Sequence, residues 1–244
     1  MIFIRTDMNE MIATGHVMRC LAIADAAKQL GEETTFILSD LQAVHLIEAR
    51  GHSFICMETK WNQMDLELPV LKKIIETEKI ETILIDSYQV TSDYMKEVSK
   101  LVKVFYIDDL GEQTYHADGI ICYAPYWEKF SYHKRYMGKE LCLGMEYIPL
   151  RKAFCNCARK EIKPEAEHLL LLSGGTDPYG VLSQLLLGIE IEKYKEITVI
   201  CGRYDGNYED LYQKYEKLQN VHVYQSVEKI EDYMKRADVA ISAG

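Results

Sequence analysis

A glycine-histidine pair is the first feature of the sequence that could do chemistry. Gly15 and His16 stand between the strand-like opening IFIRTD, which holds Arg5 and Asp7, and a helix-like stretch. A histidine in the first turn of a helix feels the positive end of the helix dipole, which disfavours imidazolium and leaves a ring that can accept a proton. This position predicts a general base, while a histidine that caps the helix or packs under the loop explains it equally well. Gly15 suits a sharp turn or a close ligand approach.

A second candidate site lies in the run LLLLSGGTDPYG. Ser173, Gly174 and Gly175 end a buried strand, Asp177 stands where an N-cap would, and Pro178 stands at the first helical position. Glycines let backbone N–H groups approach an anion, and the helix start adds its dipole, so a diphosphate is a natural ligand. The run is neither the dinucleotide fingerprint nor a P-loop motif, and glycines at such a turn are at least as often structural.

Other polar residues also follow apolar runs. In open parallel sheets, ligands bind outside the carboxyl ends of the strands, so these positions join the candidates. Asp86 and Tyr88 end the run ILIDSY, and Tyr88 could act as a donor or hold a water molecule. Asp108 and Asp109 end FYIDD, where a capped turn is the better explanation. Glycine-containing segments follow two further apolar runs, at Gly202 and at 242–244.

Strands and helices must bring these residues together. Strand-like apolar runs alternate with amphipathic helix-like stretches along the chain, which predicts α/β units with parallel sheets covered on both faces. The expected strands are 2–7, 34–40, 52–57, 81–88, 102–110, 117–123, 168–175, 197–202, 221–225 and 238–244. The expected helices are 16–30, 41–51, 66–78, 92–102, 178–191, 207–218 and 227–236.

The alternation is interrupted once. Segment 151–167 is charged, contains a proline and has no sustained apolar period, and the pattern restarts after it. We therefore expect an N-terminal Rossmann-like domain over 1–154, a linker over 155–167 and a second Rossmann-like domain over 168–244. The sequence stops where an α/β unit would turn into its next helix, so we expect the second domain to be incomplete.

Composition narrows the function classes. The 244 residues are 48% hydrophobic with 14 Gly and 5 Pro, which is typical of a globular protein. A net charge of −10 without a dense Lys/Arg run argues against a nucleic-acid partner. The charged opening and short apolar runs argue against a secretory signal or a membrane span, so we expect a cytoplasmic protein. Seven irregularly spaced cysteines fit a reducing compartment, and Cys155 and Cys157 lack a second pair for a metal.

Several motifs together resemble a known family. The sequence is similar, from residue 4 to residue 244, to the UDP-sugar hydrolases of pseudaminic acid biosynthesis, whose close relatives are spore-coat polysaccharide biosynthesis proteins. The motifs that carry the resemblance are IRTDMNEMIATGHVMRCLAIADAAKQLG, ILIDSY, FYIDDL, LCLGMEYIPLRKAF, LLLLSGGTDP, VICG and ADVAISAG. It implies cleavage of UDP-2,4-diacetamido-2,4,6-trideoxy-β-L-altropyranose. It also implies the GT-B fold, similar to the MurG transferase, with the active site between two domains.

The resemblance also implies roles for individual residues. His16 would activate the attacking water and Tyr88 would hold that water or the sugar, with Asp7 as a further catalytic candidate. The residues expected to bind the sugar side of the substrate are Arg5, Gly15, Arg19 and Asp86. The residues expected to bind the nucleotide are Ser173, Gly174, Gly175, Asp177, Gly202 and Gly244. UDP is a good leaving group, so the expected partner is the UDP-sugar alone, with no metal and no cofactor.

Two departures from the family pattern stand beside this assignment. The segment CYAPYW occupies the place of a family asparagine, which bears on sugar specificity, and the family pattern continues after ISAG with Gly, Thr and Glu. Those residues are absent here, so we expect this sequence to fold with reduced or no turnover. Two rival functions also stay open: a glycosyltransferase of the same fold and a non-catalytic nucleotide-sugar-binding protein. The oligomeric state is open as well.

Overall fold

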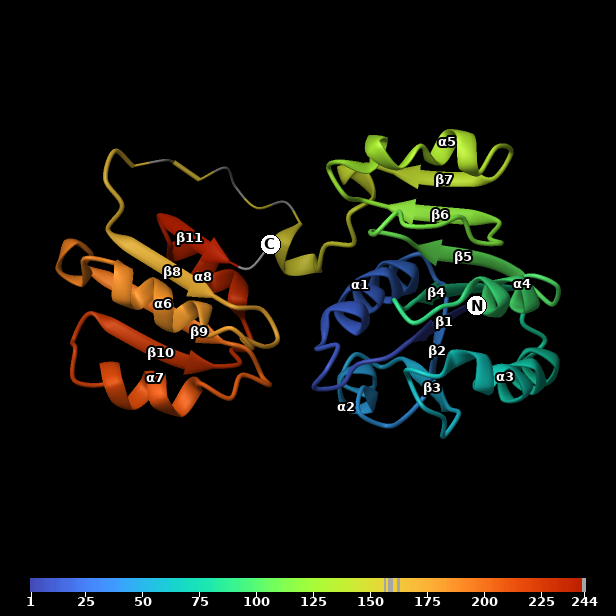
Figure 1. Ribbon diagram of the computed structural model, residues 1–244, viewed down its shortest axis with the longest axis horizontal. Coiled ribbons are helices and arrows are strands. Elements are labelled where there is room, and N and C mark those ends of the chain that lie inside the picture. The colour runs from blue at the N-terminus through green and yellow to red at the C-terminus, as the bar shows by residue number, and fades with distance from the viewer. Residues whose placement is uncertain (156, 158–159, 162, 243–244) are drawn as a thin grey trace. The chain divides into compact units, whose positions relative to one another are not determined.

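The chain divides into two compact units, Met1–Arg151 and Lys152–Gly244. A computed structural model describes all residues except 156, 158–159, 162 and 243–244. Each unit is built on one parallel β-sheet with helices packed against it (Figure 1). The structure thus confirms the predicted α/β class with two parallel sheets.

The first unit contains a seven-stranded sheet with the order β3-β2-β1-β4-β5-β6-β7. All neighbouring strands are parallel, and β1 lies between β2 and β4. The direction of winding changes between β1 and β4, which is the point where sheets of this kind bind ligands. The strands are β1 (Ile2–Thr6), β2 (Thr34–Leu38), β3 (Ser53–Cys56), β4 (Thr82–Asp86), β5 (Lys103–Ile107), β6 (Gly119–Cys122) and β7 (Glu140–Leu143).

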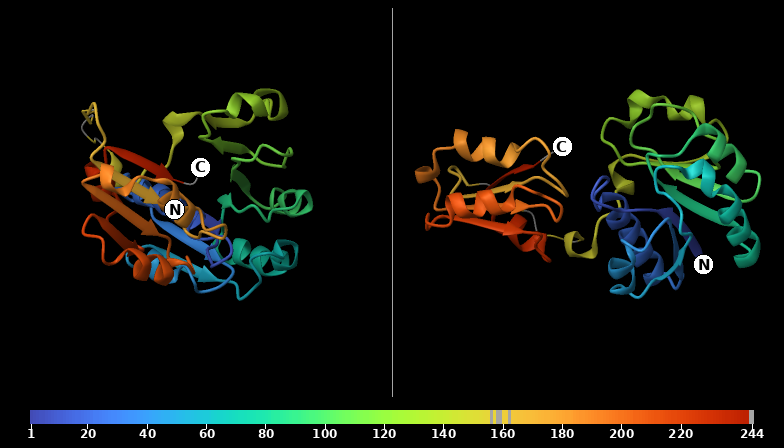
Figure 2. Two further views of the ribbon diagram at one scale, coloured as in Figure 1. Left: turned by 60° about the vertical axis from the view of Figure 1, so that its left-hand side comes forward. Right: turned by 60° about the horizontal axis from the view of Figure 1, so that its bottom comes forward.

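Helices cover both faces of this sheet. The strands are apolar on both sides, so successive residues such as Phe3 and Ile4 enter two different hydrophobic clusters. In the right-hand view of Figure 2, α1 and α2 lie on the opposite side of the sheet from α3 and α4. The helices are α1 (Gly15–Gln29), α2 (Val44–Glu48), α3 (Met64–Glu78), α4 (Ser92–Val98) and α5 (Tyr132–Arg135).

Strand β7 was not among the strands expected from the sequence. It is only four residues long, and just one of them, Leu143, is buried. It pairs along its length with β6, from Gly119 opposite Glu140 to Cys122 opposite Leu143. A half-exposed edge strand of this length carries too few apolar residues to stand out as a run.

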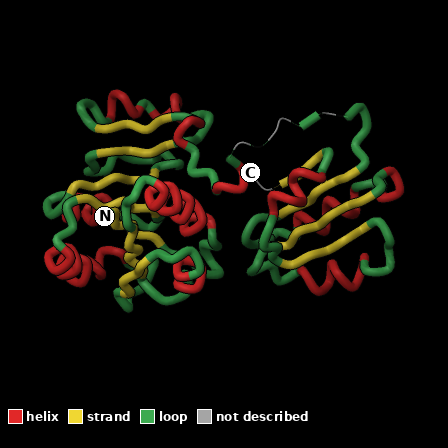
Figure 3. The backbone as a smooth tube through the Cα atoms, turned by 180° about the vertical axis from the view of Figure 1, so that it is seen from behind, coloured by secondary structure: helices red, strands yellow, loops and turns green. Residues whose placement is uncertain are grey.

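The second unit contains a four-stranded parallel sheet with the order β10-β9-β8-β11, seen as adjacent strands in Figure 3. Apolar side chains of α6 and α7 pack in one cluster with the sheet, whereas Ile230 and Tyr233 of α8 pack in another. The strands are β8 (His168–Leu172), β9 (Glu196–Cys201), β10 (Val221–Gln225) and β11 (Val239–Ser242). The helices are α6 (Val181–Gly188), α7 (Tyr208–Tyr215) and α8 (Ile230–Arg236). Within the described ranges, no helix combines the length and the hydrophobicity needed to cross a bilayer.

Candidate functional site

The candidate site of the first unit lies at the carboxyl ends of β1 and β4. His16 is the second residue of α1, in its first turn, as the sequence predicts. Thr14, and not His16, is the N-cap residue of this helix, and Thr14 makes no side-chain capping bond. Asp86 is the last residue of β4, and Tyr88 follows two residues later. The switch point of the sheet therefore brings His16, Asp86 and Tyr88 together.

A buried carboxylate orients the imidazole of His16. Nδ1 of His16 lies 2.7 Å from Oδ1 of Asp86, and Asp86 has no exposed surface. A carboxylate oxygen can only accept, so Nδ1 carries the hydrogen and the neutral ring presents an unprotonated Nε2. Burial alone would raise the pKa of Asp86, but hydrogen bonds from Arg19 and His16 outweigh it and lower that pKa. Asp86 thus contacts His16 from a fully buried position, and its expected substrate contact stays a prediction.

Arg19 occupies the space between two carboxylates. Its Nε donates to Asp86 Oδ2 at 2.6 Å, and its Nη1 donates to Asp109 Oδ2 at 2.6 Å and to the Tyr123 hydroxyl at 2.7 Å. The side chain is only 12% exposed. Its donors are therefore directed to other side chains around the site, and its expected contact with substrate stays a prediction.

Tyr88 is the exposed member of this cluster. Its hydroxyl donates to Asp109 Oδ2 at 2.8 Å, and its ring meets the imidazole of His16 edge-on with centroids 4.5 Å apart. The residue is 45% exposed. Burial of the hydroxyl and the adjacent Asp109 raise the pKa of Tyr88 well above its ordinary value. The hydroxyl proton is thus committed to Asp109, and the free lone pairs make Tyr88 an acceptor.

Asp109, for which the sequence favoured a capped turn, and Tyr123, which the sequence analysis did not single out, also belong to this cluster. They follow β5 and β6, and these strands succeed β4 in the sheet order. Adjacent parallel strands end at the same edge, and that was the available signal. The capped-turn explanation holds for Asp108, whose Oδ1 accepts from the backbone N–H of Gly111 at 2.8 Å, but Asp109 bonds Arg19 and Tyr88 instead.

Arg5 and Asp7 have structural roles, contrary to the expectation from the sequence. Arg5 is fully buried and donates through Nε and Nη2 to both carboxylate oxygens of Glu67, each at 2.8 Å. Asp7 is 4% exposed and accepts from Arg5 and from the backbone N–H of Ser39. Tyr94 also donates to Glu67, at 2.8 Å. The network joins β1 to α3 and α4, so in the described structure these groups are bonded to one another within the fold.

Gly15 is not required by the local backbone. It begins α1 outside the left-handed region of φ, and a Cβ at this position would meet no atom within 4 Å. Neither a sharp turn nor close packing within the chain explains a glycine there. Its expected role beside a ligand stays a prediction.

The glycine-rich loop of the second unit follows β8. Gly174 has a φ of +80°, and the Ser173 hydroxyl lies 3.5 Å from a carboxylate oxygen of Asp205. A Cβ on Gly202 would lie 2.2 Å from the carbonyl oxygen of Gly174 and 2.3 Å from the carbonyl carbon of Gly175. Gly202 therefore lets two loops pack together, which gives it a structural explanation, and its expected nucleotide contact stays a prediction.

Asp177 caps α6, although the helix begins later than the sequence suggests. Its carboxylate accepts from the backbone N–H groups of Val181 at 2.8 Å and Leu182 at 2.9 Å. The helix starts at Val181 because Gly180, with a φ of +60°, turns the chain just before it, so Pro178 is not its first residue. An acidic side chain thus satisfies this helix start, and the expected contact of Asp177 with the nucleotide stays a prediction. Gly244, the last expected nucleotide ligand, lies outside the described residues.

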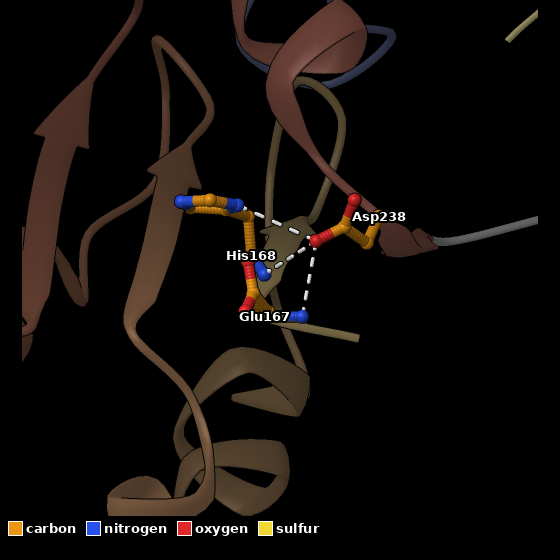
Figure 4. A group of neighbouring side chains, drawn as sticks. All are labelled: Glu167, His168 and Asp238. Carbon is orange, nitrogen blue, oxygen red and sulfur yellow. Dashed lines mark hydrogen bonds and ion pairs between the residues drawn. The ribbon is translucent and has the colours of Figure 1, made fainter. Parts of the chain in front are cut away.

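One group of side chains in the described part of the chain has the composition of a metal site. It consists of Glu167, His168 and Asp238, at the start of β8 and just before β11 (Figure 4). A carboxylate oxygen of Asp238 accepts from the backbone N–H groups of Glu167 at 3.0 Å and His168 at 2.9 Å, and these bonds lower the pKa of Asp238. Lys163 and Lys195 pair with Glu167. Because these lysines already neutralise Glu167, we explain the group as a link between the start of β8 and the residue before β11.

Comparison with known proteins finds relatives over nearly the whole chain. No family model matches the sequence. The protein MJ1062 of Methanocaldococcus jannaschii is 24% identical over 259 residues, covering 99% of this chain and 51% of the relative. The spore coat polysaccharide biosynthesis protein SpsG of Bacillus subtilis is 22% identical over 238 residues, covering 94% of this chain and 68% of the relative. The chain thus spans about half the length of MJ1062.

Two solved structures have similar folds. A glycosyltransferase from Rickettsia africae ESF-5 gives a TM-score of 0.60 at 11% identity, covering 99% of this chain and 72% of its own. The UDP-GlcNAc 2-epimerase from Neisseria meningitidis, bound to UDP-GlcNAc, gives a TM-score of 0.60 at 8% identity, covering 99% and 77%. The chain therefore has the α/β fold with two parallel sheets, of the GT-B type, that these structures share.

Proposed function

We propose that the protein is a nucleotide-sugar hydrolase that releases UDP by water attack at the anomeric carbon. The observation that carries the proposal is the 2.7 Å contact between His16 Nδ1 and Asp86, which leaves Nε2 of His16 as a proton acceptor. The similarity to SpsG and the fold shared with structures of a glycosyltransferase and a UDP-GlcNAc 2-epimerase support a nucleotide-sugar substrate.

In the proposed reaction, His16 and Tyr88 act on one water molecule. Nε2 of His16 takes a proton from the water as its oxygen bonds to the anomeric carbon, while the bond from that carbon to the diphosphate oxygen breaks. The imidazolium that forms is stabilised by Asp86. The hydroxyl of Tyr88, whose own proton is held by Asp109, accepts the second hydrogen of the water and orients it. UDP leaves without a general acid, because a diphosphate is already a stable anion.

The charges of the site support a neutral ligand group beside His16. Arg19 is the cation that contacts this cluster, and its donors are directed to Asp86, Asp109 and Tyr123. A diphosphate placed here would face the carboxylates of Asp86 and Asp109. The donors of Arg19 are already directed to these side chains and to Tyr123, so they are not available to the diphosphate. We therefore assign the sugar to this cluster, with Gly15 allowing its close approach. The loop of Ser173, Gly174 and Gly175 stays our candidate for the nucleotide.

The finer substrate assignment rests on the family resemblance. The motifs shared with the pseudaminic acid enzymes, together with the similarity to SpsG, support a UDP-linked diacetamido-trideoxy sugar of a nonulosonate or spore-coat polysaccharide pathway. We propose that the partner of this protein is a small-molecule UDP-sugar. We also propose that the protein acts in the cytoplasm, without a metal or an added cofactor.

The function is tested by incubating the protein with UDP-sugars in the absence of any acceptor. The proposal predicts that UDP and free sugar are released in equal amounts. Phosphorus NMR measures the UDP, and chromatography measures the sugar. UDP release that requires an added acceptor would indicate a glycosyltransferase. Saturable binding of the UDP-sugar with no release, and with no effect of His16→Asn, would indicate a non-catalytic binding protein.

A further inference from the structure

One guanidinium connects the two proposed catalytic side chains through their carboxylate partners. Arg19 donates to Asp86 and to Asp109, and these carboxylates bond His16 and Tyr88 respectively. We infer that Arg19 is a positioning residue that fixes the tautomer of His16 through Asp86 and the hydroxyl direction of Tyr88 through Asp109. The reaction in which the two side chains act rests on the proposed function, whereas the positioning itself is a property of the folded chain.

The two carboxylates need a cation because they share a site with little water. Asp86 is fully buried, the Asp109 side chain is 19% exposed, and Arg19 contacts both. Without the guanidinium, both carboxylates would lose their shared cation in poorly solvated surroundings, which favours uptake of a proton by one of them. A protonated Asp86 or Asp109 would carry a donor where His16 or Tyr88 now finds an acceptor. Arg19 thereby maintains both acceptors.

The geometry requires a guanidinium and is poorly suited to an ammonium. Nε and Nη2 of Arg19 both meet Asp86, while Nη1 meets Asp109 and the hydroxyl of Tyr123. The rings of Tyr88 and Tyr123 lie on the guanidinium with centroids 6.0 Å and 5.9 Å from its carbon. A planar fork spans these partners at once, whereas the ammonium of lysine is a single point of charge.

Arg19 also acts on His16 directly. Its Nη2 lies 3.1 Å from Nδ1 of His16, so the guanidinium also lies against the ring itself. The polar and titratable groups that contact His16, or contact its immediate partners, come from α1, β4 and the segments after β4, β5 and β6. They are Arg19, Cys20, Asp86, Tyr88, Asp109 and Tyr123. Of these, Arg19 is the permanent cation.

The test follows His16 by NMR in the 244-residue chain labelled with ¹⁵N-histidine. Long-range ¹H–¹⁵N spectra report which ring nitrogen carries the hydrogen, and the His16 signal is the one lost in His16→Asn. The wild type is expected to show the Nδ1–H form in the neutral ring. In Arg19→Met, the ring is expected to become a mixture of both tautomers.

Two further variants keep the test decisive. Arg50 pairs with Asp25 of α1 at 2.7 Å and lies outside the site, so Arg50→Met controls for the loss of an ion-paired arginine and is expected to leave the His16 signal unchanged. If Arg19→Met does not fold, Arg19→Lys provides the same readout, with a partial loss of the Nδ1–H form.

An unchanged tautomer in a folded Arg19 variant would contradict the inference. Activity is recorded separately: Arg19→Met is expected to lower kcat about 10-fold or more while KM stays within about two-fold, since positioning affects the chemical step. If the wild type releases no UDP but the NMR results hold, the proposed function fails and the positioning role stands. If UDP is released and the His16 signal is the same in the wild type and the Arg19 variants, the positioning role fails while the proposed function stands.

Discussion

Nδ1 of His16 and Oδ1 of Asp86 lie 2.7 Å apart across the point where the sheet of the first unit changes its winding direction. His16 enters from the first turn of α1 and Asp86 from the end of β4, 70 residues later. The two residues meet because β1 and β4 are neighbours in the sheet. His16 lies on α1, the helix that follows β1, and Asp86 lies at the end of β4. This relationship makes Nε2 of His16 the proton acceptor in the proposed hydrolysis.

Tyr88→Phe should lower kcat with little change in stability. The variant removes the acceptor proposed for the attacking water, and one such hydrogen bond contributes about 0.5–1.5 kcal/mol, or about 2- to 10-fold in rate. Steady-state UDP release measures the effect. Tyr212→Phe is the matched control, because Tyr212 is 43% exposed against 45% for Tyr88 and lies in the second unit. Equal kcat values for the two variants would remove the Tyr88 hydroxyl from the mechanism.

Asp86 should stabilise the fold above its ordinary pKa, and acid should remove that stabilisation. Because the pKa of Asp86 is lowered in the folded chain, its contribution is present above the unfolded value of about 4 and is lost as pH falls through the folded value. Denaturant unfolding of the wild type and Asp86→Asn between pH 7 and pH 3 measures this. The stability gap between them should narrow as pH falls, and a gap that widens toward pH 3 would contradict the assignment.

Gly202→Ala and Gly15→Ala should differ sharply in stability. A Cβ at residue 202 would meet backbone atoms of Gly174 and Gly175 at 2.2–2.3 Å, so overpacking should cost about 1–3 kcal/mol. A Cβ at residue 15 would meet no atom within 4 Å, and alanine favours the helix, so stability should be unchanged or rise by up to about 1 kcal/mol. Thermal and denaturant unfolding of both variants measures the difference. Comparable destabilisation in the two would show that the loop packing around Gly202 is misassigned.

The sequence predicted what local pattern controls. Apolar runs located the strands except β7, because buried strands need apolar residues on both faces, and the start of α1 placed His16 in its first turn. The direction in which a side chain leaves its strand explains why Arg5 is not beside His16. Arg5 lies two residues from Phe3 on β1, so it points to the same face as Phe3, which α3 and α4 cover, whereas His16 belongs to α1 on the opposite face. Period-two alternation contained this signal.

Long-range pairing was beyond the sequence patterns. Glu67 is 62 residues from Arg5, and Asp109 is 90 residues from Arg19, so their ion pairs depend on sheet order and helix packing. Asp177 was predicted as a cap, and it does accept from the first N–H groups of α6. The helix start itself was wrong by three residues, from Pro178 to Val181, because the positive φ of Gly180 delays it.

The most direct measurement is UDP release by the wild type and by His16→Asn, with a UDP-linked diacetamido-trideoxy sugar and no acceptor. His52→Gln is the matched control, because His52 is also buried and bonds a carboxylate, that of Asp25 at 2.9 Å, away from the site. We predict that His16→Asn lowers kcat about 10²–10⁴-fold while UDP affinity stays nearly unchanged, and that His52→Gln keeps its turnover. Turnover within a few-fold of the wild type in folded His16→Asn would contradict the account.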